Sequence, residues 1–168
     1  MTTISTYIQK QVADAHTQLA LVINGVDDAV ANTKAAGTAN TVGQTYAHAI
    51  LAADVFFNVA LRGGAPVLFT GGFAQKLGVG DPNPRNWEAI KGLKVKIADW
   101  RDYANSVIAS QGGYLATLTE AELGRAFNVF GMDTTVTDML ILATSHAALS
   151  AGDISAIKGT LGLQGYPN

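Results

Sequence analysis

The stretch Ser145–Gly165, SHAALSAGDISAIKGTLGLQG, decides which fold and which kind of site the sequence predicts. It forms the second half of an apolar segment whose pattern predicts a helix from a capping signal at Thr135 to about Lys158. His146 and Ser150 stand four residues apart in it, which is one turn of a helix. A side chain that binds metals well is thus followed by one that binds them poorly.

A polar strip is expected along one face of this helix. Because each helical residue advances about 100°, the side chains of His146, Ser150 and Asp153 fall within an arc of about 60°. In an apolar helix such a strip needs partners, which are water, a ligand, a metal ion or side chains of other helices. A hydrated groove is the alternative to a functional site.

Three further helices are predicted upstream. Apolar residues at intervals of three and four indicate a helix over Ile4–Val30 and another from Asn86 onward, which Gly112 and Gly113 are expected to interrupt or end. Between them, a capping box at Thr41 begins a helix that ends near Arg62. This second helix is apolar nearly all round, which predicts burial on several sides, including against a second subunit.

The connection formed by residues 63–85 is rich in glycine and proline and is predicted to be long and irregular. Apart from a short extended piece near residues 127–130, the rest of the sequence is helical in pattern. We therefore expect one all-α domain over residues 1–168, built as a four-helix bundle. The long connection allows either simple antiparallel order or up-down-down-up order.

Composition restricts the partners and the chemistry. Charged residues make up 14% of the chain and apolar residues 48%, which predicts that some apolar surface is covered in a homo-oligomer. The net charge of −2, without a basic cluster, argues against binding to nucleic acid or to an anionic membrane. The absence of cysteine excludes thiolate chemistry by the chain itself and agrees with a cytoplasmic location.

Three histidines, His16, His48 and His146, lie near the middle of three different predicted helices. Imidazole is a common ligand for zinc, nickel and iron, and metal sites in helical bundles are built from inward-facing side chains of neighbouring helices. The alternative is that each histidine is an ordinary core or flank residue with a hydrogen-bond partner.

Three segments together resemble the DinB-like superfamily of metalloenzymes. They are NTVGQTYAHAILAADVFF in the second helix, ATLTEAEL after the third, and the final SHAALSAGDISAIKGTLGLQGYP. The resemblance implies a four-helix bundle in up-down-down-up order, usually dimeric, with a divalent metal held by three histidines at one open end. Members include thiol-dependent transferases and isomerases, and many have no known activity.

Carried over by position, His48 matches the metal ligand of the second helix and His146 the first ligand of the last helix, while Ser150 takes the place of the third. Three outcomes stay open: Asp153 or His16 replaces the lost ligand, water completes a weak site, or no metal binds. The matching cavity would be lined by His48, His146, Ser150 and Asp153.

Two functions therefore remain. The first is a divergent metal-dependent hydrolase or thiol S-transferase of unknown substrate, which would use zinc or nickel and an external low-molecular-weight thiol. The second is a catalytically inactive, metal-free homodimer with a binding or structural role.

Overall fold

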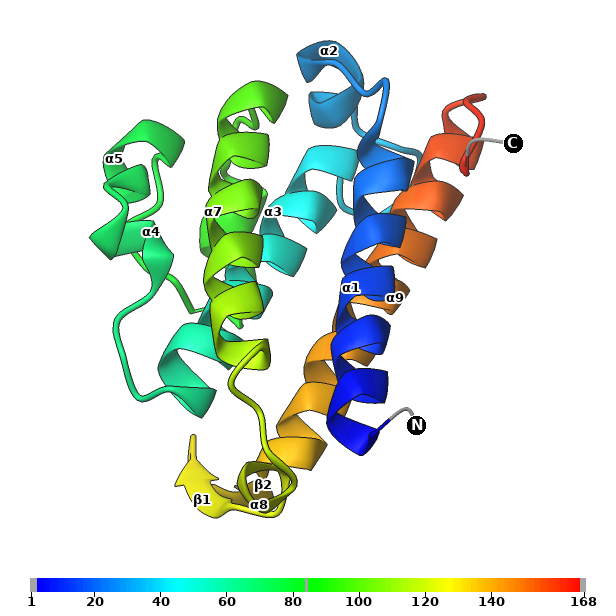
Figure 1. The fold of residues 1–168 in the computed structure, drawn as a ribbon. Coiled ribbons are helices and arrows are strands. Elements are labelled where there is room, and N and C mark those ends of the chain that lie inside the picture. The colour runs from blue at the N-terminus through cyan, green and yellow to red at the C-terminus, as the bar shows by residue number, and fades with distance from the viewer. Residues whose placement is uncertain (1–2, 84, 167–168) are drawn as a thin grey trace.

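The computed structural model describes residues 3–83 and 85–166, and this part of the chain is mostly helical (Figure 1). Four stretches are long, and shorter helices and one hairpin connect them. The elements in chain order are α1 (Ile4–Ile23), α2 (Asp28–Asn32), α3 (Val42–Asp54), η1 (Val55–Leu61), α4 (Val67–Thr70), α5 (Phe73–Leu77), α6 (Trp87–Lys91), α7 (Ile97–Leu115), α8 (Glu120–Leu123), β1 (Ala126–Val129), β2 (Met132–Thr135) and α9 (Val136–Thr160).

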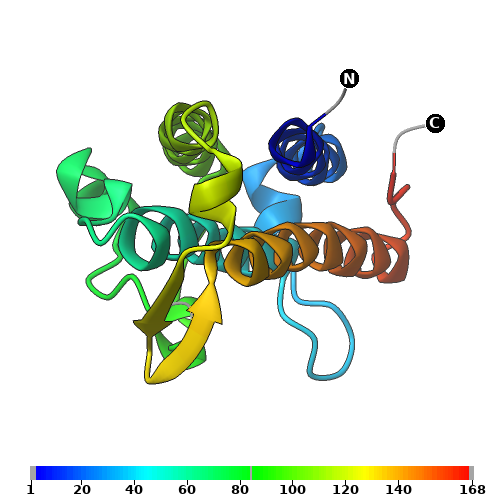
Figure 2. The same ribbon diagram turned by 60° about the horizontal axis from the view of Figure 1, so that its bottom comes forward.

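The long helices pack side by side. In Figure 1, α1 and α9 run upward, whereas α3 and α7 run downward. Helix α9 packs against both α1 and α3, and α3 also packs against α7. Seen from below in Figure 2, α1 and α7 lie on the same side of the layer formed by α3 and α9. Helix α3 is therefore the central helix, and its neighbours bury it.

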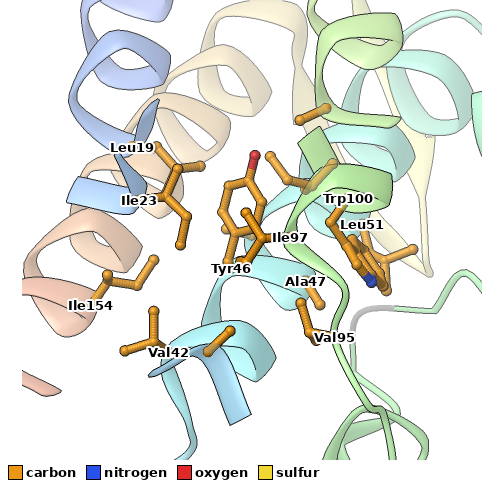
Figure 3. Packing of buried hydrophobic residues seen from close by; sticks show 14 of the residues in the cluster. Leu19, Ile23, Val42, Tyr46, Ala47, Leu51, Val95, Ile97, Trp100 and Ile154 are labelled. Atoms are coloured by element: carbon orange, nitrogen blue, oxygen red, sulfur yellow. The ribbon is translucent and has the colours of Figure 1, made fainter. Parts of the chain in front are cut away.

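The main core forms around α3 (Figure 3). Tyr46 and Leu51 of α3 pack against Ile23 of α1, Trp100 of α7 and Ile154 of α9. All five are at most 4% exposed. Burial of such side chains is the main driving force of folding, at about 1.5–3 kcal/mol for each one fully removed from water. A second cluster, around Phe57 and Leu140, fills the end of the molecule nearer the hairpin.

Helix α3 does not offer the surface to a second subunit that its apolar sequence predicts. Eleven of its thirteen residues are buried within this chain, and only Gln44 and His48 are partly exposed. The apolar character of α3 is explained by α7, α9 and the short helices around it. The exposed large apolar residues lie elsewhere, among them Ile141 and Leu149 of α9.

Helix α9 also has the length and composition of a membrane-spanning helix, with a mean hydropathy of 1.3 over a stretch of 18 residues. In this structure 39% of that stretch is buried, because α9 packs against α1 and α3. A core helix of a bundle has the same composition as a membrane span, so the sequence pattern of α9 has two explanations.

The predicted first and third helices are each split. The first ends at Ile23, because Gly25 has a φ of 72° that a helix does not allow, and α2 follows as a separate turn. The third is divided into α6 and α7. Asn32 accepts a hydrogen bond from the Val95 backbone N–H (2.9 Å) and donates one to its carbonyl oxygen (2.8 Å), which holds this segment out of a helix.

Two other expectations needed correction. Gly112 and Gly113 do not end α7, which continues to Leu115. The connection 63–85 is not wholly irregular, since it contains α4 and α5, while its residue 84 lies outside the described part.

The capping boxes at Thr41 and Thr135 are confirmed by reciprocal hydrogen bonds. The short extended piece is confirmed as β1, which pairs with β2 in an antiparallel hairpin.

The buried carboxylate of Asp54 joins several of these elements. Asp54 is fully buried at the point where α3 changes into the π-helical turns of η1. Its two oxygens accept hydrogen bonds from Asn58 (2.8 Å), from the backbone N–H groups of Val67 and Leu68 (2.9 Å each) and from the hydroxyl of Tyr103 (2.6 Å). Val67 and Leu68 are the first two residues of α4, whereas Asn58 lies in η1 and Tyr103 in α7. Asp54 therefore fixes η1, α4 and α7 relative to one another.

Asp54→Asn should lower the free energy of unfolding by about 3 kcal/mol, because an amide NH2 group would face donors that now point at a carboxylate. Tyr103→Phe removes one donor and keeps the carboxylate, so it should cost less, about 1.5–3 kcal/mol. Urea denaturation monitored by circular dichroism measures both. A loss below 1 kcal/mol in Asp54→Asn would contradict this role.

Candidate functional site

His48 of α3 and His146 of α9 meet across the interface of these two helices. Their Nε2 atoms are 3.0 Å apart, which is a hydrogen-bond distance. The residues come together from positions 98 apart in the sequence because α3 and α9 pack along their length. The structure thus joins the two histidines that the resemblance to the DinB-like superfamily singled out.

Aromatic rings hold the histidine pair in place. The His48 ring stacks on Trp87 of α6, with centroids 4.0 Å apart and an interplanar angle of 26°. The His146 ring meets Phe56 of η1 edge to face, with centroids 5.7 Å apart. Both imidazoles are partly buried, so their orientations are set by packing as well as by their mutual hydrogen bond.

The contact between the rings restricts their protonation states. A hydrogen bond between two Nε2 atoms needs a hydrogen on one and a lone pair on the other, so at least one ring is neutral and carries its hydrogen on Nδ1. Burial lowers the pKa of His146, and the negative charge of Asp153 opposes that shift without cancelling it. His146 is therefore more difficult to protonate than a histidine in water.

The pair borders a cavity of about 550 Å³. One wall is formed by Ala52 and, from η1, by Val55, Phe56 and Val59, which continue the face of His48 along the same helix. The facing wall comes from α9, where Met139 and Leu142 precede His146. The lining is mostly apolar, and its volume lies in the range usual for sites that bind small organic molecules.

Two connecting segments complete the cavity. The segments on either side of residue 84 contribute Asp81 and Arg85, and the turn of the hairpin contributes Phe130. The Arg85 guanidinium lies over the Phe130 ring, 5.9 Å from its centroid. Both side chains are exposed, whereas Ala52 and Val55 are buried, so Arg85 and Phe130 form the mouth and the helices form the inner end.

The other predicted site residues are placed differently. Ser150 is buried in α9 but is not among the residues that line this cavity, and Asp153 is exposed. His16 of α1 is buried near Gln111 of α7, where desolvation lowers its pKa and the neighbouring Gln111 side chain partly opposes the shift. The structure brings together His48 and His146 and leaves His16 apart from them.

The donor set does not fit a metal centre of the catalytic type. Such a zinc site uses three protein ligands, with Zn–N distances of about 2.0–2.1 Å. Within residues 3–83 and 85–166, no three His, Cys, Asp or Glu side chains form a group that could hold a metal ion. The two Nε2 atoms instead lie at a hydrogen-bond distance from one another.

Several residues of the cavity carried no signal in the sequence analysis. Arg85 and Phe130 belong to connections whose path no periodicity predicts, and Trp87 begins the short helix α6. Phe56 and Val59 could have been found, because they lie eight and eleven residues after His48 and so share its helical face. Met139 and His146 are seven residues apart and share a face of α9 for the same reason.

The fold and the site define a helical protein in which two neighbouring histidines border an apolar cavity. The model of the DinB superfamily matches residues 11–154, and the chain therefore belongs to this superfamily. It is similar in fold to a solved structure described as the conserved protein of locus from Enterococcus faecalis. The TM-score is 0.80, the identity 19%, and the match covers 96% of this chain and 99% of that one. No curated protein matches the chain.

The buried histidines predict a pH dependence of stability. Burial lowers the pKa of both His16 and His146, so below their ordinary pKa of about 6.5 the unfolded chain binds more protons than the folded one. The free energy of unfolding should therefore fall as the pH falls from about 7.5 to 5.5. The double variant His16→Gln/His146→Gln should show a flatter dependence in urea titrations. An unchanged slope would contradict the assignment.

Proposed function

We propose that the chain is a metal-free member of the DinB superfamily that binds a small, largely apolar molecule in the cavity beside His48 and His146. The observation that carries the proposal is that the two imidazoles meet at the wall of an apolar cavity and that no third metal-binding side chain is grouped with them among the described residues. Each ring uses the nitrogen that faces the other histidine, and both rings are fixed by aromatic neighbours.

The balance of polar and apolar groups in the cavity supports binding. Apolar side chains such as Phe56, Met139 and Leu142 supply most of its surface, and a few polar groups can orient a ligand. In a protein of this superfamily a divalent metal would act as a Lewis acid or would activate a bound water or thiol. Two imidazoles alone do not make the three-ligand site that this chemistry uses.

The competing function is the metal-dependent hydrolase or thiol S-transferase, with zinc or nickel and an external thiol. The distance between the two Nε2 atoms is close to the value of about 3.3 Å expected for two nitrogens bound to one tetrahedral zinc ion. The two functions are therefore separated by metal analysis rather than by geometry.

Protein purified without a histidine tag, incubated with zinc or nickel and then dialysed, should contain much less than one metal ion per chain by mass spectrometry. Ser150→His adds an imidazole one helical turn from His146 and should raise the content towards one ion per chain. Ser145→His, on another face of α9, is the matched control and should not. Circular dichroism checks that each variant is folded.

Stoichiometric metal in the unmodified protein that is lost in His48→Ala would contradict the proposal and favour the metal-dependent enzyme. If Ser150→His folds and still binds no metal, the interpretation of Ser150 as a substituted ligand is wrong.

We further infer that the four long stretches form a bundle in up-down-down-up order and that the protein is a homodimer. The directions of α1, α3, α7 and α9 support the first inference. The second is supported by the outer face of α9, where Ile141 is 58% and Leu149 is 70% exposed. Neighbouring positions on that face, Ala148 and Gly152, are small and uncharged and would allow close helix contact.

Light scattering at micromolar concentration should give the mass of a dimer. Leu149→Asp places a charge in the proposed interface and should shift the protein to monomers. Phe69→Asp, an exposed apolar residue of α4, is the control and should leave the mass unchanged. A monomer mass for the unmodified protein would contradict the dimer.

A further inference from the structure

Arg85 at the mouth of the cavity has a positive charge without an anionic partner among the described residues. Its backbone N–H donates a hydrogen bond to Asn83 Oδ1 (3.0 Å), which fixes the segment. The guanidinium itself contacts the face of the Phe130 ring and takes part in none of the ion pairs found in the described part of the chain. Five N–H donors in a planar fork are thus available at a cavity mouth.

The neighbouring carboxylate of Asp81 is already engaged. Its Oδ1 accepts a hydrogen bond from the Asn83 backbone N–H (2.9 Å), and its Oδ2 accepts one from the Asn86 side chain (3.0 Å). These donors lower the pKa of Asp81 and keep it ionised. Both oxygens are therefore occupied by Asn83 and Asn86, and neither pairs with Arg85.

Phe130 has a backbone conformation that phenylalanine rarely adopts. Its φ is 55°, and it is the one residue other than glycine with a positive φ in the described part of the chain. Together with Gly131, at φ 79°, it forms a two-residue hairpin turn, where Asn or Gly at the first position costs less. The ring is 52% exposed, so it gains little from burial.

The strained turn does place the aromatic ring at the cavity mouth beneath the guanidinium. There it provides an apolar wall and holds Arg85 by a cation–π contact, which leaves the edge of the guanidinium accessible. Strain retained in one exposed residue next to a cavity is typical of functional sites.

On these observations, and on the proposed function of the cavity as a small-molecule site, we propose that its ligand is an apolar carboxylate. The carboxylate pairs with Arg85 in a bidentate manner at the mouth, and the aliphatic or aromatic body lies against Phe56, Met139 and Leu142. The two histidines are engaged with each other and do not compete with Arg85 for the anion.

Calorimetric titration with octanoate, octanamide and octylamine tests the proposal, since the three probes share one apolar chain and differ in charge. Octanoate should bind at least about tenfold more tightly than octanamide, and octylamine should bind most weakly. Trp87 lines the cavity and should report binding by a change in fluorescence.

Arg85→Met keeps a long side chain without the charge and should weaken octanoate binding by about tenfold or more while leaving octanamide binding unchanged. Lys10→Met is the matched control, because it removes one positive charge from the exposed face of α1, away from the cavity, and should not alter either affinity.

The outcomes separate this inference from the proposed function. Octanamide binding equal to that of octanoate, or octanoate binding that Arg85→Met leaves unchanged, overturns the role of Arg85 while the cavity remains a binding site. Tighter binding of octylamine overturns the anionic ligand in favour of a cation near Asp81. If none of the three probes binds, both the inference and the proposed function fail.

Discussion

The buried carboxylate of Asp54 is the constraint on which the arrangement of the molecule depends. A fully buried carboxylate is unstable unless hydrogen bonds compensate for its desolvation, and Asp54 receives four. The donors come from η1, from the first turn of α4 and from Tyr103 of α7. Burial and the adjacent carboxylate raise the pKa of Tyr103, so it stays a donor at every physiological pH.

This constraint affects the cavity although Asp54 does not line it. The helix becomes π-helical directly after Asp54, and the residues that follow, Val55, Phe56 and Val59, form one wall of the cavity. The extra residue in each π-helical turn changes which side chains face α9, a feature often found near functional sites. By fixing α4, Asp54 also sets where the chain that leads to Arg85 and Trp87 begins.

The capping signals could be predicted from the sequence, and the long-range contacts could not. The capping boxes at Thr41 and Thr135 depend on residues three apart, so the pattern suffices to predict them. The break between α6 and α7 depends on Asn32 and Asp28, whose side chains bind the backbone of Val95 and Ile97 more than sixty residues away. No periodicity contains that information.

The residues of the candidate site likewise differ in how far the sequence predicts them. His48 and His146 were singled out by the resemblance to a family, and the packing of α3 on α9 accounts for their contact. The role of Asp54 has no signal in the sequence, because its partners, Val67, Leu68 and Tyr103, are brought to it only by the tertiary fold. Arg85 and Phe130 meet through a connection and a hairpin turn, where local composition gives no contact partners.

The central claim is that His48 and His146 are bonded to each other and not to a metal ion. Nitrogen-15 NMR of the imidazole side chains, recorded before and after addition of zinc, tests it directly, with His16→Gln used to assign the third ring. The account predicts one protonated and one unprotonated Nε2, with a scalar coupling between these nitrogens across the hydrogen bond, and no change on adding zinc. Loss of the coupling, with both Nε2 resonances moving to the positions of metal-bound imidazole at one equivalent of zinc, would contradict it.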